Sequence, residues 1–220
     1  MDTIEDRCHP SVSMSPNWNE PLQVATKRLL DVTISLLLMI LLSPMLLLFA
    51  VLIKLTSSGP VFYPWRVVGK NGRPFVGFKF RSMVVDADKL KADLVKLNEM
   101  RGPVFKLTND PRITPIGRWL RRYSLDELPQ LYSVFIGDMS LVGPRPPLQT
   151  EYVQFTSFQK QKLSVKPGMT CLWQVQGRTD INDFADWVKL DLEYIKRWSL
   201  ALDLKILILT ASTIVSGSGK

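Results

Sequence analysis

Two adjacent carboxylates, Asp126 and Glu127, follow three arginines in the stretch RWLRRYSLDELPQL, which begins at Arg118. Ser124 and Glu127 have the spacing of a capping box, so the pair is predicted to lie in the first turn of a helix. Free backbone N–H groups and the positive helix end favour anions there. An ionised carboxylate beside a phosphoryl group held by arginines can act as a nucleophile. The alternative is that these residues only cap and charge a helix start.

Basic residues elsewhere in the chain could help to hold a phosphate. Arg118 and Arg121 precede the carboxylates directly. Period-two alternation places Lys79 and Arg81 on one face of a predicted strand. These two side chains could also be simply solvated, but aligned with the arginines they would form a phosphate site.

A rigid turn is predicted at Gly143-Pro144-Arg145-Pro146. The prolines on both sides of Arg145 fix the backbone, so its guanidinium is presented at little entropic cost. As a tetrapeptide this signal is weak, because a proline-rich turn is its default explanation.

A membrane helix is predicted before this basic region. No charged residue occurs from Val32 to Ile53, which is long enough for a helix to cross a hydrocarbon core. Ser43-Pro44 falls at the midpoint, where the proline should break or kink the helix. Positive residues flank both ends and the following region is basic, which favours two cytoplasmic ends. We therefore expect a re-entrant helix over residues 27–55; a spanning helix with a tolerated break is the alternative.

The composition is typical of one domain with an appendage. The chain has 220 residues, 46% of them hydrophobic, and a net charge of +8, so it can bury a core and favours anionic partners. Its two cysteines, Cys8 and Cys171, lack metal-ligand spacing, and a reducing compartment fits. No Walker loop or dinucleotide fingerprint occurs. Residues 1–26 are polar and aperiodic and are expected to form a flexible tail.

The remaining elements define the fold class. Two β-rich runs, from Val61 and from Pro74, are joined by a turn at 70–73 and predict a hairpin. Helical periodicity predicts helices over 86–100 and from about 183 to 213. The fold class predicted is α/β (α+β): a small, mainly helical domain with a short β-hairpin, anchored by the re-entrant helix.

Six stretches in order resemble those of the bacterial sugar transferases known as monotopic polyprenol-phosphate phosphoglycosyl transferases. They are KRLLDVTISLLLMILLSPMLL, FVGFKFRSM, TNDPRITPIGRWLRRYSLDELPQL, GDMSLVGPRPP, VKPGMTCLWQVQGR and DLEYIKRWSLALDLKILILT. The resemblance runs from Lys27 to about Thr213. It implies a membrane-associated enzyme that moves a sugar-1-phosphate from a nucleotide diphosphate sugar to a polyprenol phosphate, usually undecaprenyl phosphate, and releases UMP.

The same resemblance assigns roles to individual residues. The family's Asp-Glu dyad falls on Asp126 and Glu127. It implies that Asp126 attacks the sugar-bearing phosphate to form a phosphosugar enzyme, which the lipid phosphate resolves. Mg2+ is the implied cofactor, and Glu127 would help to hold it, orient the dyad or transfer a proton. Arg121 would grip phosphate, and the Pro-Arg-Pro element at 144–146 would lie near the nucleotide.

The resemblance also implies an organisation and a location. A flexible tail (residues 1–26) and a re-entrant helix (27–55) would precede a cytoplasmic transferase domain with amphipathic interfacial helices (56–220). The protein would lie at the cytoplasmic face of the bacterial inner membrane. Its partners would be a UDP-sugar and undecaprenyl phosphate, and the sequence is most similar to transferases that use glucose or galactose phosphate. No nucleic acid partner is expected, and a homodimer is possible.

Two other functions are weighed against the transferase. A non-enzymatic basic module that binds anionic lipid or nucleic acid at a membrane surface explains the charge but gives the carboxylate pair no task. A soluble hydrolase of nucleotide sugars does not explain the long apolar segment. The transferase, priming exopolysaccharide, capsule or O-antigen synthesis, accounts for both.

Overall fold

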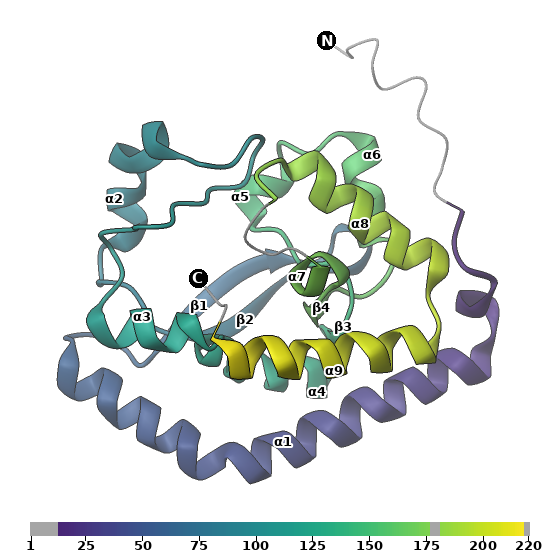
Figure 1. Cartoon of the computed structure of the whole chain (residues 1–220), viewed down its shortest axis with the longest axis horizontal. Helices are drawn as coiled ribbons and strands as arrows, with labels where there is room; N and C mark the ends of the chain where they lie inside the picture. Colours follow the sequence, from purple (N-terminus) through teal and green to yellow (C-terminus); the bar gives the residue numbers. More distant parts are fainter. Residues whose placement is uncertain (1–12, 177–180, 218–220) are drawn as a thin grey trace.

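The protein is mainly helical, as predicted. The computed structural model describes residues 13–176 and 181–217. The α-helices are α1 (Pro21–Thr56), α2 (Ala87–Leu94), α3 (Pro115–Arg122), α4 (Leu131–Ile136), α5 (Gln149–Tyr152), α6 (Ser157–Lys160), α7 (Leu172–Gln176), α8 (Phe184–Arg197) and α9 (Leu200–Ser216) (Figure 1). Short 3-10 helices are η2 (Pro16–Asn19), η3 (Lys70–Gly72), η4 (Val95–Leu97), η5 (Leu125–Gln130) and η6 (Gln161–Leu163).

Two small sheets lie inside the helical shell. Strands β1 (Phe62–Val68) and β2 (Pro74–Phe80) form the predicted antiparallel hairpin, and β3 (Ser140–Val142) pairs in parallel with β4 (Gly168–Thr170). At the hairpin turn Asn71 and Gly72 have φ values of 56° and 79°. Asn and Gly tolerate positive φ better than other residues, which explains why this turn forms here.

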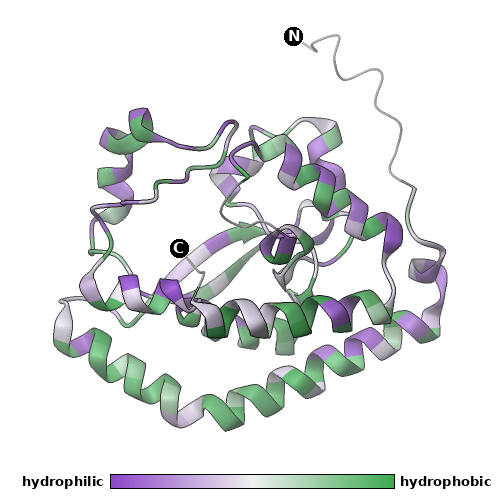
Figure 2. Cartoon of the chain, in the orientation of Figure 1, coloured by the Kyte–Doolittle hydropathy of each residue, from purple (hydrophilic) through white to green (hydrophobic). Residues whose placement is uncertain are grey.

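Helix α1 is the only helix within residues 13–176 and 181–217 that is long and apolar enough to cross a membrane. It runs through Pro44 and forms a shallow V whose two ends point towards the rest of the domain (Figure 1). Ser43 Oγ donates a hydrogen bond to the carbonyl of Ile40 at 2.8 Å. Figure 2 shows that the middle of the helix is hydrophobic, and leucines such as Leu37 and Leu41 are exposed there.

The first described residues do not form a flexible tail. Helix α1 begins at Pro21 instead of residue 27, and η2 precedes it. Trp18 stacks on Trp198 with ring centroids 3.9 Å apart, and its indole N–H donates to the carbonyl of Ile195. The expectation for residues 1–26 is therefore wrong for 13–26, because one aromatic residue in the polar stretch docks on the core; residues 1–12 lie outside the described part.

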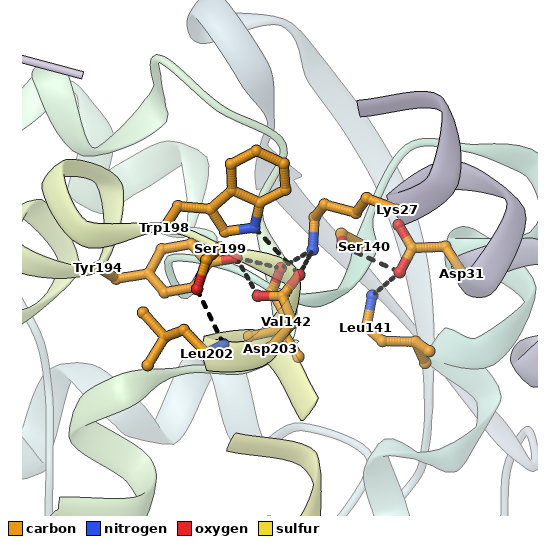
Figure 3. Close-up of polar contacts among 10 residues, drawn as sticks. All are labelled: Lys27, Asp31, Ser140, Leu141, Val142, Tyr194, Trp198, Ser199, Leu202 and Asp203. Carbon is orange, nitrogen blue, oxygen red and sulfur yellow. Dashed lines mark hydrogen bonds and ion pairs between the residues drawn. The ribbon is translucent and has the colours of Figure 1, made fainter. Parts of the chain in front are cut away.

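The N-terminal half of α1 is held by buried polar contacts (Figure 3). Lys27 Nζ forms an ion pair with Asp203 at 2.5 Å and donates to the carbonyl of Val142 at 3.0 Å. Asp31 accepts hydrogen bonds from the Ser140 hydroxyl and the Leu141 N–H. These contacts tie the helix to β3 and to the start of α9.

The C-terminal half of α1 packs on a different part of the same domain. Phe49 and Ile53 form a small hydrophobic cluster with Phe80 of β2 and Leu120 of α3. All four side chains are buried. Both ends of the apolar helix are therefore bound to one domain, while its middle is exposed.

The single long helix predicted from about residue 183 to 213 is two helices, α8 and α9, with a corner at Trp198 and Ser199. Ser199 caps α9 by accepting the N–H of Leu202. The corner lets Asp203 accept hydrogen bonds from Tyr194 Oη (2.7 Å) and from the indole of Trp198 (3.1 Å). Tyr194 and Trp198 are almost fully buried, so they belong to the core and not to a membrane interface.

Candidate active site

The carboxylate pair and most of the predicted basic residues line one cavity of about 440 Å3. This volume is in the range of pockets that hold small-molecule ligands. The predicted site residues on its wall are Lys79, Arg81, Arg121, Asp126, Glu127, Arg145 and Pro146. Tertiary folding thus brings together strand β2, helix α3, the short helix η5 and the proline-rich turn after β3.

The carboxylate pair lies in the first turn of η5, and the capping box is absent. Ser124 has a left-handed backbone (φ 54°) and its side chain does not cap the helix. Pro129 has no N–H to donate back to Leu125, so the chain forms a 3-10 helix and α-helical geometry begins only at Leu131. The prediction of an ordinary α-helical start is wrong for this reason, although both carboxylates still lie at a helix N-terminus.

Within residues 13–176 and 181–217, two cations contact Glu127. Lys79 Nζ donates to Glu127 Oε1 at 2.7 Å, and Arg145 Nη1 lies 3.5 Å from the same oxygen. Burial lowers the pKa of Lys79, and the neighbouring Glu127 carboxylate opposes this shift. Lys79 on β2 and Arg145 in the proline-rich turn thus hold Glu127 in place. This also restrains its neighbour Asp126, which is buried and lines the cavity.

Trp65 is a site residue that sequence reasoning missed. Lys79 Nζ lies 3.9 Å, and the Arg145 guanidinium 5.9 Å, from the centre of its ring. The negative face of an indole attracts cations, so the Trp65 ring stabilises the positions of both the Lys79 ammonium group and the Arg145 guanidinium. The predicted hairpin could have indicated Trp65, because Trp65 on β1 lies directly opposite Gly77 on β2. Gly77 has no side chain and leaves space over the Trp65 ring.

Arg81 and Arg121 form a second basic part of the wall. Arg121 Nε donates to Ser82 Oγ at 2.9 Å. Arg81 Nη2 donates to the carbonyl and hydroxyl oxygens of Ser57, just beyond the end of α1. Arg81 is only 5% exposed, yet its Nε and Nη1 have no hydrogen-bond partner in the part of the chain that the structure describes. A buried, partly unpaired guanidinium favours an anion in the cavity.

Three predicted binding residues lie outside the described lining of the cavity. Arg118 is exposed on α3, one helical turn before Arg121 and on the same side of the helix, but its side chain is not among those that line the cavity. Gly143 donates to the carbonyl of Thr170, and the carbonyl of Pro144 accepts the N–H of Gly168. A side chain at Gly143 would come within 2.6 Å of the Lys166 carbonyl. Gly143 and Pro144 therefore join β3 to β4 and act only indirectly, by placing Arg145.

A second buried ion pair supports the proline-rich turn. Lys162 Nζ lies 2.5 Å from Asp191 Oδ2, and both side chains are almost fully buried. Burial raises the pKa of Asp191, and Lys162 and the nearby Arg145 oppose this shift. Helix α8 thus contributes a carboxylate beneath Arg145. No spacing in the sequence indicated these contacts, because Asp191 lies 29 positions after Lys162 and 46 positions after Arg145.

A membrane-length helix joined to a small α+β domain, with a carboxylate pair in a basic cavity, agrees with one family. The sequence profile of the bacterial sugar transferases matches residues 22–217, and the chain belongs to this family.

Three bacterial sugar transferases and exopolysaccharide proteins are similar to this chain over most of its length. The chain is 48% identical over 193 residues to the galactosyl transferase CpsE of Streptococcus agalactiae, which covers 88% of this chain and 43% of CpsE. It is 39% identical over 203 residues to the exopolysaccharide production protein ExoY of Sinorhizobium fredii, with 90% and 89% covered. It is 41% identical over 198 residues to an undecaprenyl-phosphate galactose phosphotransferase of Salmonella typhimurium, with 88% and 41% covered. The chain thus spans less than half of CpsE and of the Salmonella protein but most of ExoY.

Proposed function

We propose that this protein is a phosphoglycosyl transferase that moves a hexose-1-phosphate from a UDP-sugar to undecaprenyl phosphate and releases UMP. The observation that carries the proposal is the carboxylate pair on the wall of a cavity lined by cations, in a domain bound to a membrane-length helix. The names of the relatives, a galactose phosphotransferase and an exopolysaccharide production protein among them, support a role in starting polysaccharide synthesis.

The reaction consists of two displacements at one phosphorus. An Asp126 oxygen forms a bond to the sugar-bearing phosphorus, and the bond from that phosphorus to the bridging oxygen breaks, so UMP leaves with the electron pair. A phosphate oxygen of the polyprenol phosphate then attacks the same phosphorus and displaces Asp126, which regenerates the carboxylate. Lys79, Arg121 and Arg145 reduce the repulsion between the anionic nucleophile and the diphosphate.

The proposed cofactor is Mg2+, held by Asp126 and Glu127. Among the described residues no group of three or more His, Cys, Asp or Glu side chains forms a complete metal cage. Two adjacent carboxylates facing a cavity nevertheless suit Mg2+, which commonly uses one or two carboxylates together with substrate phosphates and water. When bound, the ion neutralises charge on the diphosphate and the departing UMP.

The proposed topology is re-entrant, with both ends of α1 at the cytoplasmic face. Contacts from Lys27 at one end and from Phe49 and Ile53 at the other bind the same domain, and a polar domain cannot lie on both sides of a bilayer. The exposed apolar middle, bent around Pro44, would enter the membrane and return.

Pro44→Ala is expected to expose the N-terminal tail to the periplasm in a fraction of the molecules. Alanine restores the missing hydrogen bond and removes the clash with the preceding turn, so the helix straightens towards a span. The measurement is labelling of Cys8 with a membrane-impermeant maleimide in intact cells. Cys171 should not react, because it is buried and its burial raises the pKa of the thiol. Cys8→Ser is the control, and an unchanged, protected Cys8 in the Pro44 variant would show that the bend does not set the topology.

Glu127→Gln is expected to lower kcat/KM for UMP release by roughly 10²–10³-fold. Glutamine keeps the size of the side chain but leaves the charges of Lys79 and Arg145 unpaired beside Asp126. Glu193→Gln is a matched control, because Glu193 also pairs with an arginine, Arg197, but on the surface. Wild-type kinetics in the Glu127 variant would exclude a role for its charge.

The experiment that tests the proposed function is UMP release by the purified protein mixed with UDP-glucose, UDP-galactose or an N-acetylated UDP-sugar, with Mg2+ and undecaprenyl phosphate. Release that requires the lipid is the expected result and identifies the sugar at the same time. No release from any of these donors would exclude the proposed reaction and favour the non-enzymatic membrane-surface module.

A further inference from the structure

One wall of the cavity carries two tryptophans whose indole N–H groups have no acceptor among the described residues. Trp173 of α7 and Trp187 of α8 stack with ring centroids 4.1 Å apart and 6° between their planes. Their residues are 3% and 7% exposed, and both line the cavity. Neither Nε1 donates a hydrogen bond within the described residues. Buried indole N–H groups usually have a partner, so this wall lacks two acceptors.

Two other tryptophans of the chain show the usual arrangement. Trp198 donates to Asp203 at 3.1 Å, and Trp18 donates to the carbonyl of Ile195 at 3.1 Å. Both of these bonds lie in the packed contact between the N-terminal segment and α8–α9. The unpaired N–H groups are thus found where a ligand can enter, not throughout the core.

The tryptophan wall lies beside the phosphate-binding groups. Trp187 and Asp191 are one turn apart on α8, and successive turns of a helix are about 5.4 Å apart. Asp191 lies close to Arg145, whose guanidinium is 3.5 Å from Glu127. Trp173 and Trp187 also line the same cavity as Asp126 and Arg145, so a ligand that reaches the carboxylate pair can contact this wall.

We propose that Trp173 and Trp187 bind the sugar ring of the donor, an inference that rests on the proposed function and adds the sugar subsite to it. A pyranose offers an apolar C–H face to an indole and hydroxyl oxygens to its N–H. Glu151, on the same cavity wall, supplies a carboxylate that can accept from a sugar hydroxyl. The sugar is joined through its anomeric oxygen to the phosphorus that Asp126 would attack, whereas the uracil is separated from that phosphorus by a second phosphate and a ribose.

The test measures binding in the Asp126→Asn protein, which prevents covalent chemistry. Isothermal titration with UDP-glucose, UDP-galactose and UDP is compared for this parent, for added Trp173→Phe or Trp187→Phe, and for added Trp119→Phe as a control. Phenylalanine keeps an aromatic ring but removes the N–H donor. Trp119 is 45% exposed on α3 and lies outside the described cavity lining.

Each cavity variant is expected to raise the Kd of the preferred UDP-hexose by about five- to tenfold, the size of one lost hydrogen bond, and to change the Kd of UDP less than about twofold. The Trp119 variant should change neither value. A loss of folded protein would raise the apparent Kd of UDP and of the UDP-hexose by the same factor, so destabilisation does not imitate this selective change.

Two outcomes would overturn the proposal. Equal weakening of UDP-hexose and UDP would assign the wall to the nucleotide, and unchanged values for both would show that the N–H groups contact no part of the donor. Failure of the proposed function is different: the parent would bind neither UDP-hexose nor UDP, and the wild-type protein would release no UMP. In that case no sugar subsite exists either.

Discussion

Asp126→Asn is expected to abolish UMP release, with a loss on the order of 10⁴-fold or more in kcat/KM. The neutral amide can neither attack the phosphorus nor serve as a leaving group for the lipid phosphate. The side chain keeps its size, and Glu127 remains bound to Lys79 and Arg145, so the fold and membrane association should be unchanged. The measurement is UMP release with a UDP-hexose, Mg2+ and undecaprenyl phosphate.

A donor with a labelled sugar shows whether Asp126 is the nucleophile or only assists another residue, because a nucleophile retains the labelled phosphosugar. Without lipid, the wild-type protein should retain one labelled phosphosugar, and added undecaprenyl phosphate should remove it. The Asp126 variant should retain none, and Asp93→Asn, which changes an exposed carboxylate on α2, should behave as the wild type. A labelled Asp126 variant would mean that another residue is the nucleophile.

Lys27→Met is expected to lower the free energy of unfolding by about 3–5 kcal/mol. Removal of the ammonium group leaves the buried Asp203 carboxylate without its counter-charge (Figure 3). Tyr194 and Trp198 still donate to Asp203 and hold it in place, so it cannot turn to solvent. The measurement is denaturant unfolding in detergent, followed by tryptophan fluorescence.

Two further variants show whether the loss comes from the unpaired charge. Lys54→Met removes an exposed lysine near the other end of α1 and should cost less than about 0.5 kcal/mol. Lys27→Met combined with Asp203→Asn should recover part of the stability, because no uncompensated charge remains. A Lys27 variant that unfolds at the wild-type denaturant concentration would show that the pair makes no net contribution.

Local sequence signals predicted the parts of the protein that depend on neighbouring residues. Strand alternation placed Lys79 and Arg81 on one face, and both line the cavity. The Asn71-Gly72 turn predicted the hairpin, because few other residues adopt its backbone angles. The uncharged stretch around Pro44 predicted a long helix with a bend near its middle. The adjacent carboxylates were selected as candidates by type and spacing, whereas their catalytic role was implied by the family resemblance.

Other features required the tertiary structure. Arg118 and Arg121 are equivalent as sequence signals, but only Arg121 lies on the described cavity wall, where it donates to the Ser82 hydroxyl. The helix type at the carboxylates is instead a local effect: Pro129 lies close to the helix start, where a proline can move the first α-helical turn later, and α-helical geometry indeed begins only at Leu131.

The sequence by itself indicated the candidate carboxylate pair, the hairpin and the length of the apolar helix, since each depends on residues within a few positions of one another. The tertiary structure alone decided that Lys27 meets Asp203, that Trp65 supports two cations, and that Trp173 stacks on Trp187. Periodicity shows which face of an element is apolar, but it does not specify which distant element covers that face. Partners far apart in the chain are selected by the packing of the whole domain.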